Sequence, residues 1–533
     1  MEQKWAIDNL KINKIMEIYR SIQSYGTLLL AMYLMITIGA CKSETKTIQT
    51  TKDHCASIRS TQGLDIGTYL TPLDSLLAKL SGAYVLEDGD GSMIARAWLT
   101  SHATQTIDIQ YFIFSIDNIG LIACDYLVKA ADRGVKVRIL VDDIMVDAEA
   151  EDIKIMDAHP NIEIKIYNPG INLGKNLFQK ITKIATDFRG INQRMHNKIF
   201  VADGKTVITG GRNIADEYFD YDHEYNFRDR DIFLIGQICK PIQQSFETFW
   251  NHKLSVTVGE ILKDEPKISY HPSLYSKLHQ YACDTSNYWP QIRKRVANIP
   301  SAFNDLVKQG NLIWSDSISY VSDEPGKNGG TKGLSGSGKS TEALISLLKN
   351  AQKTVDIQSP YLVTTEESRK LFADAVARGV KIRILTNSLA STDNLEAFSG
   401  YQRDRKALLK TGVNIFEFRP DAACRKRLMT GALKEKPDFQ PIFGLHAKSM
   451  IIDRKTTVIG TFNLDPRSTH LNTECMVVIH NQRLTDGVRK GFEDEFQPEN
   501  AWQVTETWNP DQMVGKTKRI KTYIRKVVPK SVL

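Results

Sequence analysis

A long internal repeat constrains the fold of this chain more than any other feature. Three short segments recur in the same order and at nearly constant spacing: TIDIQ at 106 and TVDIQ at 354, RGVKVRIL at 133 and RGVKIRIL at 378, HNK at 196 and HAK at 446. Repetition at a fixed period indicates an architecture built from copies of one unit. We therefore expect one domain that is duplicated, with small insertions.

Each copy alternates strand-like and helix-like patterns. A β-rich run at 107–114, or 355–363 in the second copy, precedes an amphipathic helix, and a continuous apolar strand such as 135–141 follows. Strand, helix and strand at this spacing predict βαβ units, with parallel strands covered by helices. We expect an α/β protein of two lobes, each with a mixed or mostly parallel sheet flanked by helices.

Changes in composition suggest where the lobes begin and end. The expected order is a first lobe at 76–255, a linker with some local helix at 256–339, a second lobe at 340–500 and a basic tail at 501–533. From Lys516 onward this tail has seven Lys and Arg and no acidic residue. It could contact anionic lipid headgroups or simply face solvent, and the sequence leaves both interpretations open.

The amino terminus is typical of an exported protein. Residues 27–40 form the only long uncharged apolar run, basic residues precede it, and Ile-Gly-Ala leads into Cys41. Fourteen helical residues span about 21 Å, less than a bilayer core. This pattern predicts a signal peptide at 1–40 that resembles a lipoprotein signal, with Cys41 as lipid anchor and 41–75 as a tether. An uncleaved anchor and a buried helix are the alternatives.

Net charge and cysteine content say less about the function than the repeat and the amino terminus do. The formal charge of +7 is mild and fits an anionic partner, phospholipid or nucleic acid, without choosing between them. Seven cysteines, none at C-x-x-C spacing, give neither a disulfide framework nor a zinc motif.

The chemistry lies in a five-residue template that occurs once in each copy. Counting from the histidine, Lys stands at +2, Asp at +7, Gly at +14 and Asn at +17. The first set is His196, Lys198, Asp203, Gly210 and Asn213; the second is His446, Lys448, Asp453, Gly460 and Asn463. Finding it twice, at equivalent places in a repeat, excludes coincidence.

The residue types suit a phosphodiester. Histidine and lysine at i and i+2 of a strand point to one face, and the asparagine follows a glycine-containing turn. Two such faces brought together offer two imidazoles, two ammonium groups and two amides. One imidazole attacks phosphorus and the other transfers protons, while the cations hold the phosphate oxygens, so we expect no metal and no cofactor.

The repeated motif H-x-K-x(4)-D-x(6)-G-[GST]-x-N resembles that of the phospholipase D superfamily, over most of residues 76–500. The resemblance implies two lobes with pseudo-twofold symmetry around one active site and a phosphohistidine intermediate. It makes His196 the nucleophile and His446 the general acid and base. Lys198, Lys448, Asn213 and Asn463 then bind phosphate.

The same resemblance implies an acid after each motif that orients a histidine. Glu474 fits after the second motif, and Asp229, with Asp231 close behind, fits after the first. Asp203 and Asp453 belong to the catalytic motif, but we expect them to hold the loop together. Arg212, inside the first motif, is a further candidate for a phosphate contact.

Longer stretches resemble the bacterial cardiolipin synthases, especially the C-type branch: GRNIADEYF at 211–219 and FNLDPRS at 462–468. The resemblance implies transfer of a phosphatidyl group between phospholipids such as phosphatidylglycerol and phosphatidylethanolamine, at a membrane surface of the cell envelope, outside the cytoplasm. A hydrolytic phospholipase D, a nuclease and a non-catalytic envelope lipoprotein are the alternatives. Nucleic acid is not an expected partner.

Two further segments have open interpretations. Residues 333–340 satisfy the P-loop pattern G-x-x-x-x-G-K-S, but a polar stretch precedes them where a P-loop has a buried strand, so we expect a linker and no nucleotide. Residues 175–189 have an apolar face flanked by Lys and Arg, which suits either an interfacial membrane helix or an ordinary helix packed on the lobe.

Overall fold

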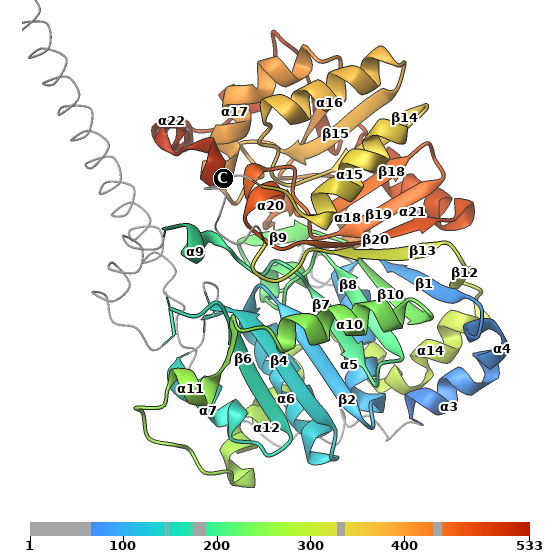
Figure 1. Ribbon diagram of the computed structural model, residues 1–533, viewed down its shortest axis with the longest axis vertical. Coiled ribbons are helices and arrows are strands. Elements are labelled where there is room, and N and C mark those ends of the chain that lie inside the picture. Colours follow the sequence, from blue (N-terminus) through green and yellow to red (C-terminus); the bar gives the residue numbers. More distant parts are fainter. Residues whose placement is uncertain are drawn as a thin grey trace, which may run out of the picture.

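The computed structural model describes residues 65–143, 146–147, 149–170, 172–173, 188–327, 336–429 and 440–533. Two lobes are stacked on each other, the first repeat below and the second above (Figure 1). Each lobe is built around one β-sheet with helices on both faces. This confirms the predicted α/β architecture of two related lobes.

The first lobe has a nine-stranded sheet in the order β11-β6-β4-β2-β7-β8-β10-β1-β12. Its strands are β1 (Ser81–Leu86), β2 (Thr106–Tyr111), β4 (Lys136–Asp142), β6 (Ile162–Tyr167), β7 (Ile199–Ala202), β8 (Thr206–Gly210), β10 (Asp231–Gly236), β11 (Ser255–Thr257) and β12 (Ile313–Ser315). Among the neighbouring strands described in this sheet, only the pairs β2–β4 and β4–β6 are parallel. The strands of the histidine motif form short hairpins and are therefore antiparallel, so the sheet is mixed.

The second lobe repeats this plan in an eight-stranded sheet, β13-β20-β19-β18-β14-β15-β16-β21. Its strands are β13 (Ile318–Ser322), β14 (Thr354–Gln358), β15 (Lys381–Asn387), β16 (Asn414–Phe418), β18 (Lys448–Ile452), β19 (Thr456–Gly460), β20 (Cys475–His480) and β21 (Ala501–Val504). Equivalent ion pairs recur as well. Arg138 binds Asp108 in the first lobe, and Arg383 binds Asp356 in the second, both at 2.6 Å.

The sheet of each lobe separates an outer core, covered by helices, from a core shared by both lobes. On the outer faces lie α5 (Gly89–His102) and α6 (Asn118–Asp132), and in the second lobe α15 (Lys339–Asn350), α16 (Glu366–Ala377) and α17 (Leu395–Leu409). The shared core is formed by apolar side chains of both sheets, with α10 (Cys239–Trp250) and α21 (Gln482–Glu495) beside it: Ile199, Val201, Ile232 and Leu234 meet Leu445, Ile451, Ile459 and Val477. Its burial holds the lobes in one relative position.

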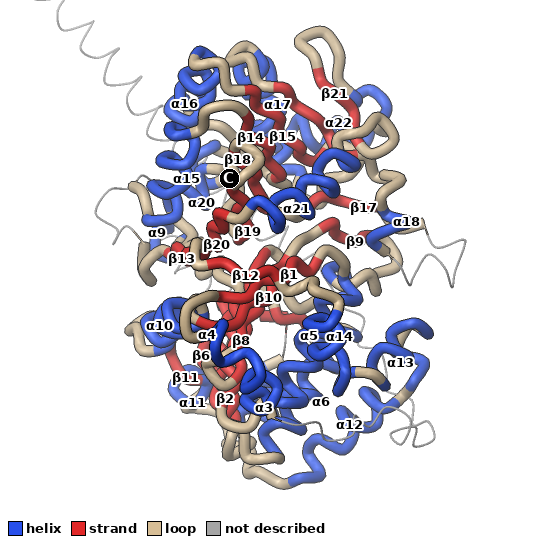
Figure 2. Tube along the Cα trace, turned by 90° about the vertical axis from the view of Figure 1, so that its right-hand side faces the viewer, coloured by secondary structure: helices blue, strands red, loops and turns tan. Residues whose placement is uncertain are grey.

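A small parallel pair also joins the lobes. Strand β9 (Tyr225–Arg228) of the first lobe pairs with β17 (Ile442–Leu445) of the second, and the two lie side by side at the junction in Figure 2. Because β9 leads directly to Asp229 and β17 leads directly to His446, this pairing places residues of the two repeats together.

The segments outside the two repeats are more ordered than their composition suggested. Part of the expected linker 256–339 packs on the first lobe as α12 (Ser276–Cys283), α13 (Pro290–Ala297) and α14 (Ile299–Lys308), while its strands β12 and β13 extend one sheet each. Apolar residues such as Ile292, Ile299 and Phe303 explain this, because they are buried in the first core.

The two outer boundaries also differ from the expected ones. Within the expected tether 41–75, α3 (Ile66–Leu70) packs Tyr69 against Trp98 of the first lobe. Within the expected tail 501–533, β21 is the edge strand of the second sheet and α22 (Lys516–Ile524) packs against α17. The described part of each segment, from residue 65 and from residue 501 onward, therefore packs on a lobe.

Other expectations lie outside the described residues. These are the signal peptide, Cys41, and the greater part of the basic segment 175–189, of which only α9 (Phe188–Asn192) is described. Among the described residues, no helix has the length and apolar character needed to cross a membrane.

Candidate active site

Each motif histidine is bound by a carboxylate from the other repeat. Nδ1 of His196 lies 2.8 Å from Oε2 of Glu474, and Nδ1 of His446 lies 2.6 Å from Oδ2 of Asp229. Both histidines are nearly buried and both carboxylates are fully buried. With a carboxylate as acceptor, the ring proton resides on Nδ1, which leaves Nε2 on the opposite edge of each ring for chemistry.

The backbone makes these crossed pairs by the same device twice. In one, the residue before His446, Leu445, pairs with Arg228, the residue before Asp229, and the His446 amide donates to the Arg228 carbonyl at 2.8 Å. In the other, Met195 pairs with Thr473, and the His196 amide donates to the Thr473 carbonyl at 3.0 Å. The two lobes are therefore related by a pseudo-twofold axis at the site.

Glycine lets the acid-bearing strands come this close. Gly210 has φ of +151°, and a Cβ on it would lie 2.5 Å from the Cα of Asp231. At the equivalent Gly460 a Cβ would lie 2.3 Å from the Cys475 carbonyl oxygen. The motif glycine is thus required by the approach of the strand that carries the histidine's partner.

The two lysines lie beside the histidines and are buried. Nζ of Lys198 donates to the carbonyl of His196 at 2.8 Å. Nζ of Lys448 lies 2.6 Å from the carbonyl of His446 and 2.9 Å from its Nε2. Burial, then the charge of Lys448, lowers the pKa of Lys198 to about 7, and burial lowers the pKa of Lys448 to about 8. The carboxylates of the protein therefore do not fully compensate the two ammonium groups, which favours an anionic ligand.

The two histidine–carboxylate pairs differ in their electrostatics. Burial and the neighbouring lysine lower the pKa of His446 to about 4, and the pKa of His196 lies well below its ordinary value for the same causes. Burial raises the pKa of Glu474 to about 7, whereas His446 and Lys448 hold the pKa of Asp229 below its usual range despite burial. Asp229 is thus the more strongly ionised partner.

The motif asparagines are not equivalent. Both polar atoms of the Asn213 side chain are hydrogen-bonded within the protein: its Oδ1 accepts from the Ile113 amide, and its Nδ2 donates to the Tyr218 hydroxyl at 2.7 Å. Asn463 keeps a buried Oδ1 without a hydrogen-bond partner in the structure. Its Nδ2 makes no hydrogen bond to the described residues either, so Asn463 is the motif asparagine that can donate to a phosphate oxygen.

The motif aspartates lie at the far ends of β7 and β18 from the histidines. Asp203 accepts hydrogen bonds from the backbone amides of residues 104–106, and Asp453 accepts the equivalent set from residues 352–354. Both have positive φ, +53° and +52°. Their geometry is that of turn-holding residues, so grouping them with the catalytic residues by motif overstates their role.

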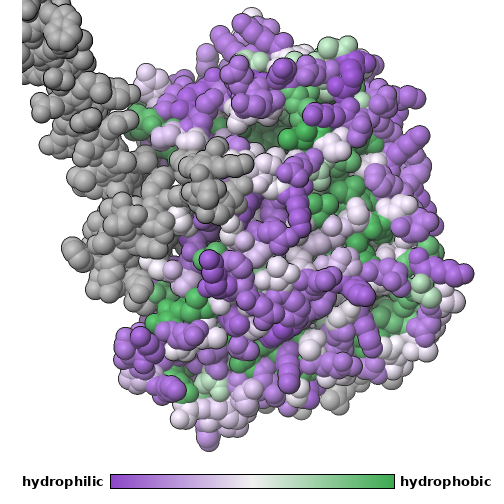
Figure 3. Space-filling view, viewed as in Figure 1, coloured by the Kyte–Doolittle hydropathy of each residue, from purple (hydrophilic) through white to green (hydrophobic). Residues whose placement is uncertain are grey.

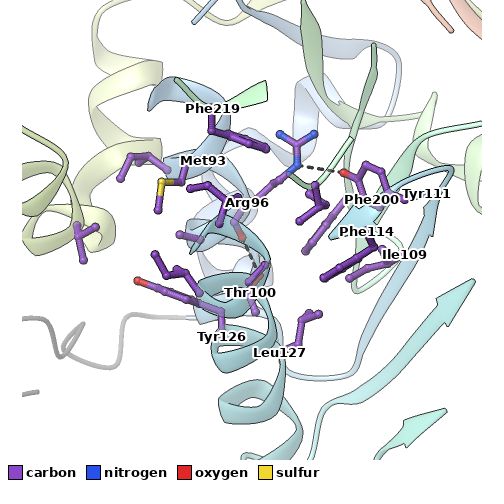
Figure 4. Close-up of a pocket in the computed structure, with 17 residues that line it drawn as sticks. Met93, Arg96, Thr100, Ile109, Tyr111, Phe114, Tyr126, Leu127, Phe200 and Phe219 are labelled. Atoms are coloured by element: carbon purple, nitrogen blue, oxygen red, sulfur yellow. Dashed lines mark hydrogen bonds between the residues drawn. The ribbon is translucent and has the colours of Figure 1, made fainter. Parts of the chain in front are cut away.

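Arg212 and Asp231 are also committed to the fold. The Arg212 guanidinium donates to four backbone carbonyls and to the Ser92 hydroxyl, so the expected phosphate contact is not made by this side chain. Asp231 binds Arg96 at 2.9 Å. Figure 4 shows Arg96 beside a small apolar cavity in the first core, with its Nε donating to the Tyr111 hydroxyl. Asp231 therefore faces this core and not a histidine.

The sequence did not single out the residues that hold Asp229 in place. Arg228 and Arg230, on either side of it, are buried, and both bind Glu87 of the first lobe. Arg228 also binds Glu495 of the second lobe at 2.7 Å, and Arg230 donates to Gln358 at 2.7 Å. The alternating pattern Arg-Asp-Arg-Asp was the one available signal, since such a charge run in a buried strand needs partners.

Aromatic rings close the site around the histidines. Phe112 makes an edge contact with His196 at 4.9 Å between centroids, and Tyr218 and Phe227 contact His446 at 5.1 and 4.6 Å. Phe112 follows β2, at the end of a central strand, which is where such folds place their ligand sites. These rings exclude water from both imidazoles.

The P-loop-like segment is described from Gly336 onward and has a different use. Asp323 accepts the backbone amide of Ser340 at 2.8 Å, at the start of α15, and the Ser340 hydroxyl donates to the Glu474 carbonyl. A carboxylate of the chain itself thus occupies the position where a nucleotide phosphate would bind. Among the described residues, no group of three or more His, Cys, Asp or Glu is arranged to hold a metal ion.

Taken together, these contacts form a buried site with two oriented imidazoles and two ammonium groups from opposite lobes. One neutral imidazole can attack phosphorus through Nε2, and the second can exchange a proton with an alcohol. The lysines can stabilise the negative charge of a pentacoordinate phosphorus.

The different surroundings of two aspartates generate the first prediction. Asp229→Asn should lower turnover of a phosphodiester about 10²- to 10⁴-fold, because His446 loses the group that orients it and stabilises its protonated form. Since Asp229 raises the pKa of His446, the fall of activity with rising pH should also move to lower pH in this variant.

Asp203→Asn is the matched control. It should lower the free energy of unfolding by about 2 kcal/mol through its lost amide contacts while leaving the shape of the pH profile unchanged. Measured pH–rate profiles and thermal melts of both variants distinguish the orienting role of Asp229 from the structural role of Asp203. An unshifted profile in Asp229→Asn would contradict the orienting role.

The lowered lysine pKa values generate the second prediction. As pH rises from 7 to 9 through the pKa values of about 7 and 8, Lys198 and Lys448 lose their protons and the site loses positive charge. The inhibition constant of inorganic phosphate should therefore increase over this range. Lys198→Arg, which stays charged, should flatten the increase. A constant inhibition constant for the unmodified protein would argue against phosphate binding by these lysines.

Comparison with known proteins agrees with this geometry. The family described as "Cardiolipin synthase, PLD-like domain" matches residues 99–250 and 344–496. An uncharacterized protein of Helicobacter pylori is 33% identical over 84% of this chain and 86% of its own length, and cardiolipin synthase C of Escherichia coli is 34% identical over 82% and 89%. A phosphatidylserine synthase crystal structure from Haemophilus influenzae, 14% identical, shares the fold with a TM-score of 0.54 over 87% of this chain and all of that one. The chain belongs to the cardiolipin synthase family of the phospholipase D superfamily.

Proposed function

We propose that this protein is a phosphatidyltransferase that makes cardiolipin from phospholipids through a phosphohistidine intermediate. The observation that carries the proposal is the pair of crossed histidine–carboxylate contacts, His196 with Glu474 and His446 with Asp229, beside two buried lysines. Membership in a family whose relatives are named cardiolipin synthases supports the lipid substrate.

The reaction proceeds in two displacements. Nε2 of His196 attacks phosphorus of a donor phospholipid, the bond to the headgroup oxygen breaks, and His446 gives that oxygen its proton. A headgroup hydroxyl of phosphatidylglycerol then loses its proton to His446 and attacks phosphorus. The P–N bond breaks, and cardiolipin and neutral His196 result. Lys198, Lys448 and Asn463 bind the phosphoryl oxygens.

Attachment to the membrane completes the proposal. Acyl chains on Cys41 would hold the enzyme beside its substrates outside the cytoplasm, since one lipid chain gives only marginal binding and two or more give stable attachment.

The third prediction concerns the product. Purified protein mixed with vesicles of phosphatidylglycerol and phosphatidylethanolamine should form cardiolipin, detected by mass spectrometry of the extracted lipids. The buried, ring-lined histidines favour an alcohol over water as acceptor. Formation of phosphatidic acid alone would instead establish a hydrolytic phospholipase D.

The fourth prediction assigns the two histidines. A phosphatidyl ester of p-nitrophenol needs no proton on its leaving group, so it should react with His446→Ala and leave a phosphatidyl group on His196, because the second displacement then lacks its base. The alkali-quenched protein, digested and analysed by mass spectrometry, should carry the adduct on His196. His196→Ala is the control and should form none. An adduct on His446 in that control would reverse the assignment.

A further inference from the structure

The C-terminal helix presents its apolar side to solvent. Within α22, Ile520, Tyr523 and Ile524 stand at helical spacing on one face and are 59%, 72% and 55% exposed. Val527, in the following turn η7 (Arg525–Val527), is 78% exposed. We call these four residues the C-terminal ridge. Contiguous exposed apolar side chains of this kind mark an interaction site.

The opposite side of α22 holds it to the second lobe by polar contacts. Lys518 donates to the carbonyls of Ala390 and Thr392 at 3.3 Å, Thr522 is buried, and Arg525 binds Glu396 at 2.7 Å. A surface helix ordinarily buries its apolar face and exposes its charges. In α22 this order is inverted, so packing within the lobe does not account for the ridge.

Positive charge surrounds the ridge. Lys516 and Lys521 are exposed, and Nζ of Lys526 lies 5.3 Å from the centre of the Tyr523 ring. No acidic residue occurs between Lys516 and Leu533. Apolar side chains flanked by lysines match the boundary between anionic headgroups and acyl chains, and a second copy of the same cationic surface would repel them.

The ridge is connected directly to the active-site loop. Six residues beyond Val527 the chain ends at Leu533, whose carbonyl accepts the amide of Arg467, while Arg467 Nε donates to the carbonyl of Val532. Arg467 lies in α20 (Pro466–His470), which follows Asn463, and it also binds Asn192 of α9 at 2.8 Å.

The views agree with this connection. In Figure 1 the C-terminus lies in the upper lobe close to α20, with α22 and α9 both toward the left. Figure 3 shows this edge of the upper lobe with apolar residues among hydrophilic ones. A surface bound at α22 is thus linked through one short segment to the site that handles the lipid.

We propose that the C-terminal ridge binds the surface of a bilayer that contains anionic phospholipid, with Ile520, Tyr523, Ile524 and Val527 inserted among the headgroups. The inference rests on the proposed function, since it assigns the ridge the task of presenting the site to lipid. It is a second membrane contact, separate from the amino terminus and on the opposite end of the chain.

The fifth prediction tests this contact locally in the full-length protein. Tyr523→Trp places a tryptophan on the ridge, and Tyr270→Trp places one at an exposed position of the first lobe. Vesicles of phosphatidylglycerol and phosphatidylcholine with brominated acyl chains quench tryptophans that enter the bilayer. The added fluorescence of Tyr523→Trp should be quenched, and that of Tyr270→Trp should not.

Enzyme activity on vesicles provides a second test of the membrane contact. Replacing all four ridge residues by serine should lower cardiolipin formation on vesicles about tenfold, and by more than on monomeric short-chain lipid. The control replaces Leu76 and Ile345, apolar residues elsewhere that are 37% and 36% exposed, by serine and should match the parent on vesicles.

The outcomes separate this proposal from the proposed function. Equal quenching of the two added tryptophans, or no quenching at residue 523, overturns the ridge as a membrane contact. Full activity of the four-serine variant on vesicles overturns the task of presenting the site to lipid. If aqueous acrylamide fails to quench the tryptophan at residue 523 in the absence of vesicles, the ridge is already covered by something else. That result also overturns the ridge as a membrane contact. Quenching at residue 523 by a protein that makes no cardiolipin keeps the contact and rejects only the reaction.

Discussion

The crossed pairing of each histidine with a carboxylate of the other repeat is the contact on which the rest of the structure depends. Glu474 reaches His196, and Asp229 reaches His446, only if both lobes dock in one position. The shared apolar core, the β9–β17 pair and the contact of Arg228 with Glu495 all fix that position. Neither lobe alone contains a complete histidine–carboxylate pair, so the active unit is the duplicated chain.

Because the charged groups of this site are buried, each of them needs a partner of opposite charge. A buried charge without a partner is destabilising by several kcal/mol, and the arginines beside Asp229 are accordingly bound by Glu87 and Glu495. The two motif lysines are the exception, as their lowered pKa values show. A phosphodiester supplies the negative charge that these lysines lack. The same desolvation that lowers their pKa values strengthens their attraction to a bound anion.

The sequence predicted what depends on residue type and period, and missed what depends on packing between distant segments. The repeat and the two motifs were enough for two α/β lobes and for the set of motif residues. Which histidine Glu474 faces could not be read from the chain, because the contact spans 278 residues and follows from how the lobes dock. Residues 256–339 were predicted as a linker with some local helix from their Pro, Gly and Ser. That composition did not indicate that apolar residues such as Ile292, Ile299 and Phe303 pack in the core of the first lobe.

The two repeats differ in sequence beside the two otherwise equivalent histidines. Where the second motif has Thr461, whose hydroxyl donates to Glu474 at 2.5 Å, the first has Gly211, on which a Cβ would lie 2.0 Å from Oδ1 of Asp229. Burial raises the pKa of Glu474 to about 7, which makes it the weaker counter-charge, and burial with Lys198 and Lys448 lowers the pKa of His196. Asp229, which His446 and Lys448 keep ionised despite burial, raises the pKa of His446 against the larger effects of burial and Lys448. The symmetry of the fold places both imidazoles alike, and the unequal carboxylates give them different electrostatic surroundings.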